Sequence, residues 1–208
     1  MWPWEHAIVG YLAYSVFCHA VYRESPGGLE AFAVVFASVL PDLIDKPLAW
    51  EYGVFPSGYA LGHSIFFAAP LSIVIGLLAH RVSRPRAGLA FGVGYLLHLP
   101  SDVLDAYVRE GVVQFELMLW PVETSQGSSR GQGFMTYFMQ LFEGYQGDLL
   151  AGELSTYLWL QLGLGLFAFT LWLYDGAPVL RECLLGARRL LVDLCERASG
   201  SLEDSPER

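Results

Sequence analysis

Long apolar stretches separated by short polar segments constrain this chain more than any other feature. A helix needs about 20 mostly apolar residues to cross the core of a bilayer. Mostly apolar stretches run over Trp4–Tyr22, Leu29–Leu40, Tyr59–Ala79, Ala87–Val108 and Tyr157–Tyr174, and all but the second, which has 12 residues, are close to that length. Only 16% of the 208 residues are charged, against about 25% in soluble domains. The sequence therefore predicts an all-α fold, a polytopic transmembrane helix bundle of about five spans that covers residues 1–175.

The arginines indicate how these spans are oriented. The segment 81–86 carries three arginines, and basic residues are enriched in the cytoplasmic loops of membrane proteins. Counting spans outward from this segment places Arg23 and the arginines after Tyr174 on the same side. We therefore expect a multi-pass protein of the cytoplasmic membrane with its N-terminus outside and its C-terminus inside.

The chain after the last span has a different pattern. Residues 176–198 repeat leucine and cysteine at helical spacing with arginines on the other side, which predicts a cytoplasmic amphipathic helix. Such a helix lies on the membrane surface or binds a partner; a helix packed on the bundle would give the same pattern. We expect the polar tail, residues 199–208, to be disordered.

Charge and cysteine content exclude several other classes. The net charge is −9 and no basic cluster is present, which argues against a nucleic-acid partner. The three cysteines lack the spacing of a metal site and are expected to be free thiols. An acidic, arginine-rich composition with a single lysine, Lys46, is typical of a halophilic microbe such as a halophilic archaeon.

Ionisable side chains inside the predicted spans gather on one side. Charged and imidazole groups are costly in the membrane and usually functional there. His98, Asp102 and Asp105 are spaced i, i+4 and i+7 and so share one helix face. The full set falls on the predicted outer side and consists of His6, Asp42, Asp45, His63, His98, Asp102 and Asp105. His19 and His80 lie toward the other side and are expected to be interfacial or hydrogen-bonded.

Imidazole and carboxylate groups together indicate a divalent metal. The mixture suits Zn²⁺, with Mn²⁺ or Fe²⁺ as alternatives, and the number of groups would allow two ions. The alternative reading is a polar network that joins the helices without a metal.

Five short motifs follow one another between Trp4 and Pro121. They are Glu-His-Ala-Ile-Val-Gly at 5–10, Leu-Pro-Asp-Leu-Ile-Asp at 40–45, Gly-His-Ser at 62–64, Gly-Tyr-Leu-Leu-His-Leu-Pro-Ser-Asp at 94–102 and Leu-Trp-Pro at 119–121. In this order they resemble the YdjM-like membrane-bound metal-dependent hydrolases, a family whose substrate is not established. The resemblance implies the metal ligands His6, Asp42, Asp45, His63, His98 and Asp102. Lys46 stands where the family often has a histidine, and it can bind an anionic group of a substrate or extend to the membrane surface.

The sequence thus favours a membrane-bound metal-dependent hydrolase of an ester or phosphoester, with a membrane lipid as the suggested partner. In this hypothesis Asp45 is the general base, in addition to being a ligand. Two other functions stay open, namely a metal or proton transporter and a non-catalytic membrane protein with a structural His/Asp cluster.

Overall fold

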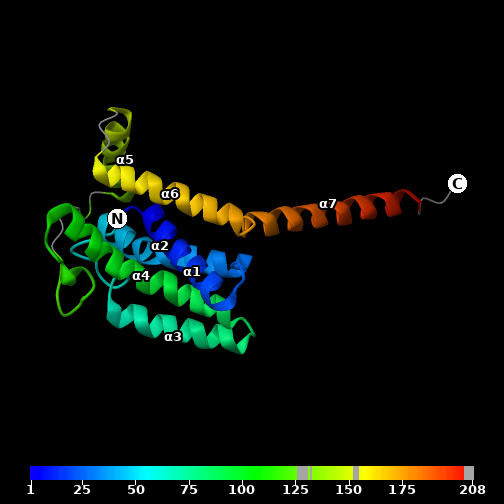
Figure 1. The fold of residues 1–208 in the computed structure, drawn as a ribbon, viewed down its shortest axis with the longest axis horizontal. Coiled ribbons are helices and arrows are strands. Elements are labelled where there is room, and N and C mark those ends of the chain that lie inside the picture. The colour runs from blue at the N-terminus through cyan, green and yellow to red at the C-terminus, as the bar shows by residue number, and fades with distance from the viewer. Residues whose placement is uncertain (126–130, 132, 152–154, 204–208) are drawn as a thin grey trace.

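The computed structural model describes residues 1–125, 131, 133–151 and 155–203 (Figure 1). All the regular structure in these ranges is helical, which confirms the predicted all-α class. The helices are α1 (Pro3–Phe17), α2 (Gly28–Trp50), α3 (Ile65–Arg81), α4 (Pro85–Glu110), α5 (Phe134–Ala151), α6 (Thr156–Tyr174) and α7 (Leu180–Glu203). A π-helical turn, η1 (Cys18–Tyr22), continues α1, and a 3-10 turn, η2 (Phe115–Leu117), follows α4.

Helices α1, α2 and α4 form the centre of the bundle. They pack on one another, whereas α3 packs on α4 and α6 packs on α1 (Figure 1). Two glycines allow this close approach: a Cβ at Gly10 of α1 would collide with Ser38 of α2, and a Cβ at Gly94 of α4 would collide with the carbonyl oxygen of Val34. Small residues have this use at helix contacts in membrane proteins. The same contacts hold the three helices close to one another.

Helix α2 is longer than the sequence predicted. The apolar stretch was expected to end at Leu40, but the helix runs through Pro41 and Pro47 to Trp50. A proline inside a helix removes one backbone hydrogen bond. Packing of α2 against both neighbours compensates for this loss. As a result Asp42 and Asp45 lie on a helix, at the end of the bundle.

Two of the described helices, α4 and α6, are long and apolar enough to cross a membrane. Helix α3 is apolar but shorter. The five-span bundle is therefore not confirmed, because α1 has only 15 residues before its π-helical turn and α2 carries several charged side chains. On α6 the large side chains of Leu160, Leu166 and Phe167 are exposed, as expected of a helix surface that faces lipid.

Helix α7 leaves the bundle and extends away from it (Figure 1). Leu184, Leu190 and Leu191 are exposed on it, so this part of the helix does not pack on the bundle. The helix continues to Glu203, into the segment that was expected to be disordered. The rest of that segment, residues 204–208, lies outside the described residues.

Candidate metal centre

The six predicted ligand residues meet at one end of the bundle. His6 comes from α1, Asp42 and Asp45 from α2, and His98 and Asp102 from α4, while His63 lies in the loop just before α3. None of the six is more than 4% exposed. The structure therefore brings together, in one buried cluster, residues that are up to 96 positions apart in the chain.

Five of the six residues form two overlapping groups that could hold a metal ion. One group is His6, His98 and Asp102, and the other is Asp42, His63 and His98. In each group one ligand atom per residue lies within 4.8 Å of the others. His98 belongs to both groups, which places it at the centre of the cluster.

His63 and His98 face each other through their Nε2 atoms. His63 Nδ1 lies 2.8 Å from a carboxylate oxygen of Asp45, and His98 Nδ1 lies 2.6 Å from the carbonyl oxygen of Ser38. Each Nδ1 is therefore the donor, and a ring that is neutral has its lone pair on Nε2. The two Nε2 atoms are only 3.0 Å apart. Two lone pairs at this distance repel, so either a proton or a metal ion must lie with them.

Several other buried atoms of the cluster are also without a hydrogen-bond partner among the described residues. They are both ring nitrogens of His6, Oδ2 of Asp42 and Oδ2 of Asp102. His6 Nε2 lies 3.1 Å from Asp102 Oδ1, but without the geometry of a hydrogen bond. Buried acceptors without partners are costly, and a bound cation would satisfy them. The donor set therefore fits a divalent metal.

Positive groups at the edge of the cluster balance part of its negative charge. Lys46 Nζ lies 2.7 Å from Asp42 Oδ1. The Met1 amino group lies 3.0 Å from Asp102 and 3.1 Å from Asp105. Burial opposes the charge on this amino group, but the two carboxylates outweigh burial and raise its pKa. This end of the bundle thus attracts positive charge.

Asp45 is placed differently from the other five residues. Its two oxygens accept the backbone N–H groups of Ala60, Gly62 and His63 at 2.8 to 3.0 Å, together with His63 Nδ1. Oδ2 accepts three of these hydrogen bonds and Oδ1 accepts one, so most of the acceptor capacity of this carboxylate is used within the protein. Asp45 is in neither of the two groups described above, and its predicted roles of ligand and general base stay predictions.

The Gly-His-Ser motif lies tightly against α2 and against the Leu-Trp-Pro motif. A Cβ at Gly62 would lie 2.9 Å from the carbonyl oxygen of Pro41, so only glycine fits there without a shift. Tyr95 donates a hydrogen bond to the carbonyl oxygen of Gly62 at 2.9 Å, and Ser64 donates one to that of Trp120. These contacts fix the backbone that carries His63. Ser64 therefore has the supporting role of a hydrogen-bonded hydroxyl.

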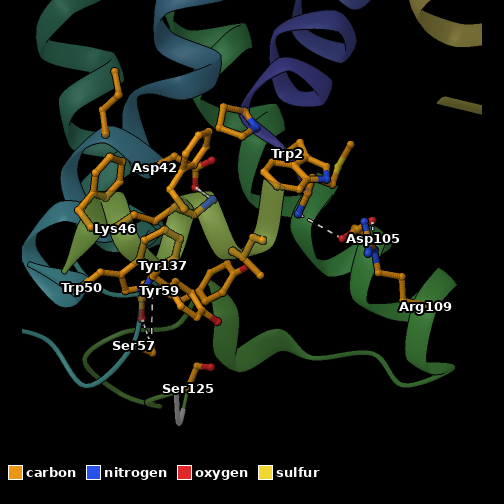
Figure 2. Close-up of a pocket in the computed structure, with 17 residues that line it drawn as sticks. Trp2, Asp42, Lys46, Trp50, Ser57, Tyr59, Asp105, Arg109, Ser125 and Tyr137 are labelled. Carbon is orange, nitrogen blue, oxygen red and sulfur yellow. Dashed lines mark hydrogen bonds and ion pairs between the residues drawn. The ribbon is translucent and has the colours of Figure 1, made fainter. Parts of the chain in front are cut away.

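A cavity of about 500 Å³ opens beside the cluster (Figure 2). Asp42 belongs to both the cluster and the cavity wall, and Lys46, Asp105 and Arg109 also line it. Much of the remaining wall is aromatic, from Trp2, Trp50, Tyr59, Phe134, Tyr137 and Phe138. The sequence indicated Lys46 but not the contribution of α5, because aromatic side chains carry neither a charge nor a metal-ligand pattern that would mark a site.

A second polar network lies at the other end of α1. Asp175 accepts hydrogen bonds from Tyr11 and Ser15, both at 2.6 Å, and lies 2.7 Å from His19 Nε2. His19 is thus hydrogen-bonded, as predicted. Burial opposes the charge of the Asp175 carboxylate, but these donors outweigh burial and lower its pKa. The network ties the end of α6 to α1 and is separate from the metal cluster.

Comparison with known proteins agrees with the motifs. No curated protein and no solved structure is significantly similar to the chain. The model of the YdjM inner membrane protein family matches residues 1–177. This match includes helices α1 to α6 and all six residues of the cluster. The chain belongs to the YdjM inner membrane protein family.

Proposed function

We propose that this protein is a membrane-bound metal-dependent hydrolase that cleaves an ester or phosphoester at the outer face of the membrane. The observation that carries the proposal is the pair of Nε2 lone pairs of His63 and His98, 3.0 Å apart. Unpartnered acceptors of His6, Asp42 and Asp102 surround this pair. Such a set of nitrogen and oxygen ligand atoms suits a bound divalent cation.

His6, His98, Asp42, His63 and Asp102 are the proposed ligands, and Zn²⁺ is the proposed ion. Neutral imidazole and carboxylate suit Zn²⁺, and Mn²⁺ or Fe²⁺ would accept the same donors. An imidazole Nε2 has one lone pair, so His98 can bind one ion at a time. A centre with two ions would therefore need a carboxylate, Asp42 or Asp102, to bind both.

Asp45 is proposed to position His63 rather than to bind the metal. Its hydrogen bond to Nδ1 fixes the tautomer and the direction of the ring, and the carbonyl of Ser38 does the same for His98. Partners of this kind are typical of histidines that bind metals.

The side chains around the cavity supply the rest of the proposed site. A bound Zn²⁺ would lower the pKa of a coordinated water toward ~7 and polarise the oxygen of an ester or phosphoester. Asp42 faces both the cluster and the cavity, so a group bound in the cavity lies next to the proposed ligands. Lys46 is close enough to Asp42 to contact the same group.

The two alternative functions have less support. A transporter needs polar groups that reach the other face. Instead Val34, Ala37 and Ala90 are fully buried on the turns of α2 and α4 that follow the cluster toward the other end. A purely structural network would pair its polar atoms, whereas several atoms of this cluster have no partner among the described residues.

The first test is elemental analysis of the detergent-purified protein, together with hydrolysis of chromogenic ester and phosphoester substrates. We expect stoichiometric metal in the wild type and its loss in His98→Ala, because His98 belongs to both groups. Asp175→Asn is the matched control, since it alters a buried polar network elsewhere and should keep the metal. A wild-type protein without stoichiometric metal would refute the proposal. Metal flux into proteoliposomes without hydrolysis would favour the transporter.

A further inference from the structure

We infer that the cavity beside the cluster binds the phosphate monoester headgroup of a membrane lipid and the first part of its acyl chains. Lys46 and Arg109 are the proposed contacts for the phosphate. The inference names a substrate class for the proposed hydrolase and in that respect rests on the proposed function. The binding itself can be tested separately from the chemistry.

Three positive groups line the cavity, namely the Met1 amino group and two side chains that come from different helices. Lys46 projects from α2 and Arg109 from α4, and Figure 2 shows both beside the cavity, with the carboxylates of Asp42 and Asp105 near them. Lys46 Nζ lies 2.7 Å from Asp42, and Arg109 Nε lies 2.9 Å from Asp105. Lysine and arginine both bind phosphate well, arginine through two parallel hydrogen bonds.

Binding of a metal would strengthen the attraction of Lys46 for an anion. Asp42 is both the partner of Lys46 and a proposed metal ligand. A divalent ion on Asp42 would neutralise the carboxylate that now pairs with Lys46. The Lys46 ammonium group would then be able to pair with another anion. Lys46 lines the cavity, so that anion would be bound there. A phosphate held there lies next to the proposed metal ligands.

The rest of the wall suits an apolar chain rather than a water-soluble phosphate. Trp2, Trp50 and Tyr59 line one part of it, and Phe134, Tyr137 and Phe138 of α5 line another. Tryptophan and tyrosine prefer the boundary between headgroups and acyl chains. An inorganic phosphate would gain nothing from so much aromatic surface.

Two leucines connect the cavity to the outer surface of the protein. Leu43 of α2 and Leu141 of α5 line the cavity and are also exposed, 56% and 41% respectively. Met135 and Met139 of α5 are exposed as well. An exposed apolar rim is what an acyl chain needs in order to enter from the bilayer. This feature favours a lipid over a free phosphate as the source of the anion.

For a phosphate monoester, hydrolysis has a simple balance. The oxygen of water forms a bond to phosphorus, and the bond between phosphorus and the lipid oxygen breaks. One proton of that water ends on the leaving lipid oxygen. The products are inorganic phosphate and a lipid alcohol, and no oxidant, reductant or second substrate is needed.

The test is binding of three probes to the full-length protein in detergent, followed by tryptophan fluorescence, because Trp2 and Trp50 line the cavity. The probes are dioctanoyl phosphatidic acid, dioctanoyl phosphatidylcholine and inorganic phosphate. We expect phosphatidic acid to bind at least about tenfold more tightly than the other two, and Lys46→Gln and Arg109→Gln each to weaken it about tenfold, as for loss of a charged hydrogen bond. Arg86→Gln is the control: Arg86 is exposed and pairs with Glu24 outside the cavity wall, so affinity should change less than about twofold.

Thermal unfolding and metal content of every variant are measured beside the binding. Equal affinity for phosphatidic acid and phosphatidylcholine would overturn the inference. Equal affinity for phosphatidic acid and inorganic phosphate would show that the cavity recognises free phosphate rather than a lipid, and would overturn that part of the inference. Selective binding that survives in folded Lys46→Gln and Arg109→Gln proteins would overturn the assigned contacts. Metal without lipid selectivity refutes this inference alone, whereas lipid selectivity without metal supports it and refutes the proposed hydrolase.

Discussion

Asp45 should control the metal affinity of this protein without touching the metal. The substitution Asp45→Asn keeps the size of the side chain but replaces one acceptor oxygen by an NH₂ donor. Oδ2 now accepts three hydrogen bonds, from Ala60, His63 N and His63 Nδ1, and Oδ1 accepts one, from Gly62. The less costly orientation of the amide therefore points its nitrogen at Gly62 and leaves that N–H without an acceptor.

The magnitude follows from two separate losses. A buried donor left without a partner costs about 1–3 kcal/mol of folding free energy. The hydrogen bond to His63 Nδ1 also loses its charged acceptor, so the ring becomes less basic and less firmly oriented. Loss of such a partner of a metal-binding histidine lowers metal affinity about 10- to 100-fold. We expect both effects in Asp45→Asn.

The assay is competition for Zn²⁺ with a chromophoric chelator, together with thermal unfolding in detergent. Asp175→Asn is the matched control, because Asp175 is also buried and accepts hydrogen bonds from Tyr11 and Ser15. We expect it to lose comparable stability while its Kd for Zn²⁺ changes less than about twofold, since distant sites act independently. The reasoning fails if Asp45→Asn binds Zn²⁺ as tightly as the wild type. It also fails if Asp175→Asn weakens binding as much, because general destabilisation would then be the cause.

Two further predictions concern stability. Gly62→Ala should lower the free energy of unfolding by about 1–3 kcal/mol, because the added methyl group would lie 2.9 Å from the carbonyl oxygen of Pro41. Gly76→Ala is the control, since its new methyl group meets nothing within 4 Å. Equal melting temperatures of the two variants would contradict the tight fit at Gly62. The lowered pKa of Asp175 means that its carboxylate stabilises the fold above the ordinary aspartate pKa of about 3.9, and that this stabilisation is lost as the pH falls further. The free energy of unfolding should therefore fall more steeply with decreasing pH in the wild type than in Asp175→Asn. Parallel plots of unfolding free energy against pH would show that Asp175 contributes nothing to the pH dependence.

The sequence could predict which residues meet but not what each one does. His98 and Asp102 were found because ionisable groups one helical turn apart are conspicuous in an apolar helix. Asp42 and Asp45 look equivalent in the sequence, since both lie on the same face of α2. Their roles separate only when the loop before α3 folds back and points three N–H groups at Asp45. That is a tertiary contact, which no local spacing encodes.

The helices themselves show a similar limit. The apolar stretches located α4 and α6 well, because length and hydropathy alone suffice for a membrane helix. The predicted end of the second stretch at Leu40 was wrong, since a proline marks a helix end only when packing does not hold the helix together. The aromatic wall that α5 gives to the cavity was also missed. Its side chains become part of a site only through the position of α5 beside α2.

The metal cluster also explains how so many ionisable groups can be buried in one small bundle. Isolated buried charges and unpaired acceptors would together exceed the few kcal/mol by which a protein of this size is stable. Here His63 is paired with Asp45 and His98 with Ser38 on the outside of the cluster, while the inner ligand atoms form two overlapping groups whose members lie within 4.8 Å of one another. Lys46 compensates only Asp42, from the edge. A cation at the centre would satisfy the inner atoms at once, so the proposed metal would stabilise the fold as well as supply the chemistry.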